Sequence, residues 1–122
     1  MAAKTPEENH KLFQAAVSRA DVDAVMELYT PDAVMTMPDS ELRGHAQLRP
    51  FFEAWLQAPA NVTLQTVCVL TEGDVALEKT RCVSVEADGT QSVSYSTVVL
   101  RREMDGQWRI CIDFPMSDAP AV

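Results

Sequence analysis

The sequence lacks the motifs of several common classes of binding site. Its 122 residues include only four glycines, and none belongs to a glycine-rich loop that could hold a phosphate group. The three cysteines are widely spaced within apolar stretches, so neither a disulfide framework nor a CxxC metal motif is present. The two histidines are far apart and show no HxxxH or HExxH spacing. We therefore predict no metal ion and no cofactor.

Basic residues and long apolar runs are also scarce. Ten Lys and Arg against eighteen Asp and Glu give a net charge of -8, which repels nucleic acid and anionic lipid surfaces. No apolar run approaches the roughly 20 residues of a membrane-spanning helix, and the first ten residues lack the apolar stretch of a secretion signal. We expect a cytoplasmic protein that binds neither nucleic acid nor membranes.

The first half of the chain has the hydrophobic periodicity of helices. Apolar residues recur every three or four positions in three segments, which predicts helices over about 6–20, 22–29 and 45–57. The short apolar segment 33–37 predicts a strand between the second and third helices.

The second half of the chain has the composition of strands. Four are expected, over 62–71, 74–87, 91–104 and 107–114, separated by short turns that each contain a glycine. Because short turns join antiparallel neighbours, these strands form a meander, and the helices cover one face of the curved sheet. The sequence thus predicts one α+β domain over residues 1–122.

Three segments give the chain a resemblance to a known family. SRADVDAVMELYTPDAVMTMP, LRGHAQLRPFFEAW and DGQWRICIDF, in this order, resemble the NTF2-like superfamily, in particular its SnoaL-like and DUF4440-type members. The resemblance implies the ketosteroid isomerase-like fold, a cone in which a strongly bent antiparallel sheet wraps around three N-terminal helices and encloses a pocket. Members often pair through the outer face of the sheet. Because they catalyse different reactions or none, the resemblance does not fix an activity.

The catalytic residues of two branches of the superfamily are not retained. Where the resemblance places the base, the Tyr and the Asp of ketosteroid isomerases, this sequence has Met37, Phe13 and Thr97. Epoxide hydrolases have an Arg-x-Asp pair on one strand and an Asp on the last strand. The nearest match to the pair is Lys79 and Arg81, whereas Asp113 matches the Asp of the last strand.

Asp113 is therefore the best candidate for a catalytic residue. The resemblance places Cys111 and Asp113 on the pocket face of the last strand, where burial would raise the pKa of a carboxyl group. The other face would carry an apolar row of four residues, Trp108, Ile110, Ile112 and Phe114. An exposed row of this kind predicts a homodimer formed through the sheet. Alternatively, Asp113 bonds a backbone amide or an Arg at the end of the strand, or faces solvent.

Further side chains are candidates for contacts with a small organic molecule in the pocket. They are Tyr29, Met35, Met37, Trp55 and Cys111. The charged stretch 78–81 leaves two possibilities open: either Glu78 and Thr80 face the pocket, or Lys79 and Arg81 do. The second arrangement would favour an anionic ligand, because Arg can hold a carboxylate with two hydrogen bonds.

The sequence leaves two functions open. The first is a SnoaL-like protein that binds a small apolar molecule and performs acid–base chemistry on it through Asp113, of the isomerase, cyclase or hydrolase type. The second is a non-catalytic dimeric domain for ligand binding or scaffolding, which has kept the fold without the reactive groups. An open cavity with convergent polar groups would favour the first, and a solidly packed interior would favour the second.

Overall fold

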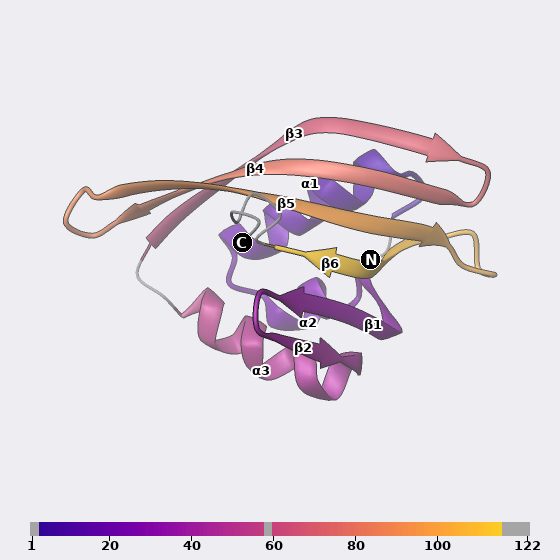
Figure 1. Ribbon diagram of the computed structural model, residues 1–122, viewed down its shortest axis with the longest axis horizontal. Helices are drawn as coiled ribbons and strands as arrows, with labels where there is room; N and C mark the ends of the chain where they lie inside the picture. The colour runs from indigo at the N-terminus through magenta and orange to yellow at the C-terminus, as the bar shows by residue number, and fades with distance from the viewer. Residues whose placement is uncertain (1–2, 58–59, 116–122) are drawn as a thin grey trace.

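The computed structural model describes residues 3–57 and 60–115 and contains three helices and a six-stranded sheet (Figure 1). The elements are α1 (Pro6–Ser18), α2 (Val22–Met26), β1 (Tyr29–Met37), β2 (Ser40–Arg43), α3 (Gly44–Leu56), β3 (Ala60–Glu72), β4 (Val75–Glu86), β5 (Gln91–Arg102) and β6 (Trp108–Phe114). The three predicted helices and the four long strands of the second half are confirmed. None of the helices within the described residues has the length and apolar character needed to cross a membrane.

Local side-chain caps explain where the first two helices begin. The Thr5 hydroxyl accepts a hydrogen bond from the backbone N–H of Glu8 at 3.0 Å, which satisfies one of the free donors at the start of α1. The Asp21 carboxylate does the same for Ala24 at the start of α2, at 3.1 Å. These caps depend on residues three positions apart, and for that reason the sequence alone predicts them.

The region after α2 differs from the prediction. The helix expected to run to about residue 29 ends at Met26, and β1 begins at Tyr29 instead of residue 33. The reason is a long-range pairing: Tyr29 lies beside Ile110 in the only parallel strand pair of the described sheet, β1 with β6. Strand β2, which was not predicted, pairs with β1 at the edge.

The sheet curves around the helices in the order β2-β1-β6-β5-β4-β3. The long strands β3, β4 and β5 arch past α1, whereas α3 lies beside β1 and β2 (Figure 1). The core fills the space between these layers, and its largest fully buried apolar side chains come from α2, β1, α3, β5 and, between α2 and β1, Leu28. This is the predicted cone of a bent sheet wrapped around three helices.

Strand β6 does not alternate as predicted, because it contains a bulge. Its register pairs Leu100 with Ile110 but Val99 with Ile112, so Cys111 is an extra residue without a direct partner on β5. The bulge reverses the alternation within the strand. Relative to the residues before the bulge, those after it therefore lie on the opposite face from the one that a regular strand would give them.

The predicted outer apolar row is consequently wrong in its first half. Trp108 and Ile110 lie in the core and are 5% and 4% exposed, whereas Ile112 and Phe114 are 45% and 37% exposed. A tryptophan and an isoleucine placed there gain more by burial against the helices than by facing outward. Any dimer through the sheet must therefore use other residues than Trp108 and Ile110.

Candidate functional site

An apolar cavity of about 290 Å³ lies between the helices and the inner face of the sheet. Four aromatic side chains of α1 and α3 line it: Phe13, Phe51, Phe52 and Trp55. The strands β4 and β5 contribute small side chains, Cys82, Ser84, Ser94 and Ser96, which leave the space open. The aromatic side chains provide apolar contacts, and the serine hydroxyls are hydrogen-bonding groups that a bound molecule could reach.

Asp113 lies at the buried end of this cavity and forms a short hydrogen bond with Tyr29. The Tyr29 hydroxyl donates to Asp113 Oδ2 at 2.5 Å, and the two residues are 1% and 6% exposed. Burial raises the pKa of Asp113 to about 6, although the hydrogen bond from Tyr29 acts in the opposite direction. Burial and the charge of Asp113 raise the pKa of Tyr29 well above 10. Tyr29 therefore stays protonated, while Asp113 changes its protonation state near neutral pH.

Next to the cavity, also lined by Asp113, lies a smaller space of about 50 Å³, here called the inner chamber. It shares Phe13, Leu64, Ser96 and Asp113 with the cavity. Its further polar residues are Asn9, His10, Tyr29, Glu78 and Thr80. Asn9 has a structural role, because its side-chain amide donates to the backbone carbonyls of Leu28 and Trp108 at 3.3 and 3.0 Å.

His10 and Glu78 form a second buried polar pair in the inner chamber. His10 Nδ1 lies 3.2 Å from Glu78 Oε1, and the Thr80 hydroxyl donates to the same oxygen at 3.4 Å. The hydrogen bond with Glu78 raises the pKa of His10, more than burial lowers it. The pair therefore favours a protonated imidazole beside a carboxylate.

The sheet register explains why Asp113 and Glu78 face the same space. Glu78 pairs with Val98, and Val98 pairs with Asp113, so all three side chains lie on one face in a row across β4, β5 and β6. On the other side of Asp113, the parallel partner on β1 is Met35. The bulge at Cys111 is what brings Asp113 into this row.

A wider groove of about 580 Å³ shares Trp55 and Ser84 with the cavity. It runs between α1, the end of α3 and the start of β3 and has a polar lining. The acidic residue in it, Glu86, is exposed. Although the groove is larger, the described residues that line it include no buried ionisable group, whereas Asp113 and Glu78 are buried in the cavity and the inner chamber, so these two spaces are the candidate site.

The predicted site residues fall into two groups. Asp113, Met35, Met37 and Trp55 line the cavity, and Tyr29 lines the inner chamber. The structure resolves the alternative in β4 in favour of Glu78 and Thr80, which face inward.

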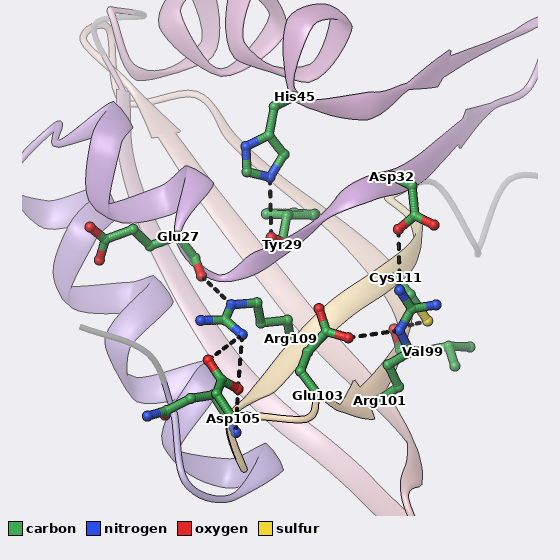
Figure 2. Close-up of polar contacts among 11 residues, drawn as sticks. Glu27, Tyr29, Asp32, His45, Val99, Arg101, Glu103, Asp105, Arg109 and Cys111 are labelled. Carbon is green, nitrogen blue, oxygen red and sulfur yellow. Dashed lines mark hydrogen bonds and ion pairs between the residues drawn. The ribbon is translucent and has the colours of Figure 1, made fainter.

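Lys79, Arg81 and Cys111 do not lie on the cavity side. Lys79 Nζ lies 5.3 Å from the centroid of the Tyr95 ring, and Arg81 donates to Gln65 Oε1 at 3.2 Å on the outer face. The Cys111 thiol lies against the Val99 carbonyl at 3.4 Å, near Arg101 (Figure 2). The expectations that Cys111 faces the pocket and that Lys79 and Arg81 could hold an anion there are therefore corrected.

The pair of His10 and Glu78 was not predicted from the sequence. His10 lies three residues before Phe13, on the apolar stripe of α1, and this unusual position for a histidine is the signal that could have found it. Glu78 gave no such signal, because the three residues before it, Val75, Ala76 and Leu77, are all apolar. The pattern therefore does not show which face of the strand points inward.

Charged side chains outside the cavity form a separate set of polar contacts (Figure 2). Arg109 donates to the backbone carbonyl of Glu27 at 3.2 Å and to Asp105 at 3.0 Å. Arg101 pairs with Glu103 at 3.1 Å and with Asp32 at 3.2 Å. Ion pairs near the surface each contribute little to stability, and the pair of Arg101 with Asp32 joins β5 to β1. Within the described residues, no group of three or more His, Cys, Asp or Glu could hold a metal ion.

The bent sheet, the three helices and the internal cavity define the NTF2-like class of fold, and the family comparison agrees. The model of the SnoaL-like domain matches residues 10–110. The chain therefore belongs to the SnoaL-like domain family, and the resemblance to the SnoaL-like members of the NTF2-like superfamily is confirmed. No curated protein matches the chain.

Solved structures with the same fold carry different names. A Thiobacillus denitrificans protein proposed to be a calcium/calmodulin-dependent protein kinase type II association domain is 21% identical, with a TM-score of 0.80, over 96% of this chain and 99% of its own. A Novosphingobium aromaticivorans protein proposed to be an aromatic ring hydroxylase is 22% identical, with a TM-score of 0.74, over 93% and 87%. A ketosteroid isomerase-like protein from Erwinia carotovora atroseptica is 20% identical, with a TM-score of 0.73, over 93% and 94%. At these identities the likeness shows the fold alone.

Proposed function

We propose that the protein binds a small, largely apolar organic molecule in the cavity and transfers protons on it through Asp113. The observation that carries the proposal is a buried carboxyl group with a pKa of about 6, at the end of an apolar cavity of about 290 Å³. Ligand pockets generally measure about 300–1,000 Å³, so the ligand is expected to be small.

The properties of Asp113 suit it to removing and returning a proton. With a pKa of about 6, about one molecule in ten holds the proton at pH 7, so both forms are available. Because Tyr29 donates to Oδ2, the oxygen Oδ1 is left to take the substrate proton. Tyr29 keeps the carboxylate in a fixed orientation during the transfer.

The cavity also offers donors for a carbonyl oxygen. Removing a proton from the carbon next to a carbonyl places negative charge on that oxygen, and a nearby hydroxyl stabilises it. Ser94 and Ser96 lie on the same wall of the cavity as Asp113 and carry such hydroxyls. Proton transfer next to a carbonyl, the chemistry of an isomerase, is therefore the reaction type that these residues support best.

Deuterium exchange into a small bicyclic ketone tests this function. We expect the protein to accelerate the exchange of the α-protons of 2-tetralone in deuterated buffer, followed by proton NMR, with a rate that saturates as the ketone concentration rises. Asp113→Asn keeps the shape of the side chain and should lower the rate at least about 100-fold. Glu53→Gln, at an exposed position of α3, is the matched control and should leave it unchanged.

Two results would count against the proposal. One is exchange no faster than in buffer for 2-tetralone and related cyclic ketones, and the other is equal exchange by the wild type and Asp113→Asn. Saturable binding without exchange would favour the second candidate, a non-catalytic binding domain. The observation that favours this candidate is the loss of the isomerase residues at Met37, Phe13 and Thr97.

A further inference from the structure

The inner chamber contains a carboxylate oxygen without a partner. Glu78 is 4% exposed, and its Oε2 has no hydrogen-bond partner among the residues that the structure describes. A buried polar group that makes no hydrogen bond is costly, and a charged one especially so. The unpaired oxygen therefore indicates that a hydrogen-bond donor which the described residues do not supply belongs in this chamber.

The neighbouring side chains of Glu78 do not donate a hydrogen bond to Oε2. His10 and Thr80 both contact Oε1, not Oε2. His10 also has a raised pKa, because the hydrogen bond with Glu78 favours the protonated ring. An ionised carboxylate only accepts hydrogen bonds, so the group that completes the site must donate one.

The position of Glu78 connects this oxygen to the proposed catalytic site. Glu78 and Asp113 lie on the same face, separated only by the strand that carries Val98. Their backbones are thus about 9.5 Å apart, twice the spacing of neighbouring strands. Both side chains line the chamber, which lies next to the cavity and shares Asp113, Phe13 and Leu64 with it. A molecule bound in the cavity can therefore extend one small group toward Glu78.

We propose that the inner chamber is a subsite for a hydroxyl group at one end of the ligand, with Glu78 Oε2 accepting its hydrogen bond. This inference rests on the proposed function and adds a substrate class to it: a compact apolar molecule that carries a hydroxyl. A volume of about 50 Å³ admits a hydroxyl or hydroxymethyl group and no larger substituent.

Two aromatic probes of nearly the same shape test the subsite. 2-Naphthol carries a hydroxyl donor, whereas 2-methoxynaphthalene carries an oxygen that can only accept. By calorimetry at pH 7, we expect 2-naphthol to bind the wild-type protein at least about tenfold more tightly, because the methyl ether leaves Glu78 unpaired. Equal affinity for the two probes would overturn the inference, because it is the result expected if water alone satisfies Glu78. The inference would also be overturned if neither probe binds.

Variants assign the preference to Glu78. Glu78→Met keeps a similar length without an acceptor, and we expect it to bind the two probes within about twofold of each other. Glu53→Met, on the exposed side of α3, is the matched control and should keep the wild-type ratio. A tenfold preference that survives in Glu78→Met would overturn the role of Glu78.

A measurement on the unaltered protein covers the case in which Glu78→Met fails to fold. The carboxyl carbon of Glu78 should shift in its NMR spectrum when 2-naphthol binds, and less when 2-methoxynaphthalene binds. Equal shifts would contradict the subsite. The deuterium exchange of 2-tetralone reports separately on Asp113. A preference for the hydroxyl probe without deuterium exchange would refute only the catalytic proposal. Deuterium exchange without the preference would refute only this inference.

Discussion

Asp113 links the stability of this protein to pH. Its pKa rises from the ordinary value of 3.8 to about 6 on folding, so the folded state binds more protons than the unfolded chain between these values. The free energy of unfolding should therefore fall by about 2–3 kcal/mol between pH 4 and pH 7 through this group. Asp113→Asn cannot ionise and should lack this component. Urea denaturation of both proteins at the two pH values measures the difference, and parallel pH dependences would contradict the assignment.

Tyr29 adjusts the pKa of Asp113 through a single hydrogen bond. The Tyr29 hydroxyl donates to the carboxylate and lowers the pKa of Asp113 against the effect of burial. Tyr29→Phe removes only that hydroxyl and should raise the pKa of Asp113 above about 6. Carbon-13 NMR titration of the carboxyl group measures it, with Tyr95→Phe on the outer face as the control. An unchanged or lower pKa in Tyr29→Phe would show that the bond does not form in solution.

At the scale of secondary-structure elements, the bulge in β6 decides which side chains are buried. Ile110, before the bulge, is in the core, whereas Ile112, after it, is exposed. Ile110→Asn should thus lower the free energy of unfolding by about 3 kcal/mol or more, since it removes buried apolar surface and buries an amide. Ile112→Asn should cost less than about 1 kcal/mol in monomer stability.

Urea denaturation at several protein concentrations separates the two effects in β6. If Ile112→Asn lowers the free energy of unfolding further in a way that depends on protein concentration, that further decrease reports on association of two chains and not on the fold of one chain. Equal monomer costs for Ile110→Asn and Ile112→Asn would mean that β6 alternates regularly, without the bulge at Cys111.

At the scale of the whole molecule, the outer face of the sheet carries an apolar row that favours association. Direct cross-strand partners on β3, β4, β5 and β6 form it: Leu70, Leu77, Val99 and Ile112. Leu70 is 68% exposed and Leu77 is 38% exposed in the isolated chain. Such a contiguous exposed apolar surface is uncommon on a monomer, and we propose that a second copy covers it.

Light scattering tests this homodimer. At micromolar concentration we expect a mass twice the 13.5 kDa of one chain, with an interface of about 1,200–2,000 Å² in total. Leu77→Glu should give the monomer mass, because it places a charge in the centre of the row. Met104→Glu, in the exposed turn between β5 and β6, is the matched control and should remain a dimer. A wild-type mass of 13.5 kDa would refute the proposal.

Features that depend on nearby residues could be predicted from the sequence. The caps at Thr5 and Asp21, the apolar stripes of α1 and α3 and the glycine turns between the long strands all involve residues a few positions apart. They specify the helices and the meander, whereas the cone was implied by the resemblance to the NTF2-like superfamily. Asp113 also emerged from the sequence, through its match to a recurrent position on the last strand.

Only the tertiary structure decided which side chains meet in the site. The local pattern of β6 is a regular alternation, with Trp108, Ile110, Ile112 and Phe114 on one face, so the bulge at Cys111 follows from long-range packing and not from that pattern. In β4, register with β5 placed Glu78 inside and Lys79 outside. The contacts of Asp113 with Tyr29 and of Glu78 with His10 join residues 84 and 68 positions apart. Their hydrogen bonds and pKa shifts depend on distances through space, which exist only once the strands have paired.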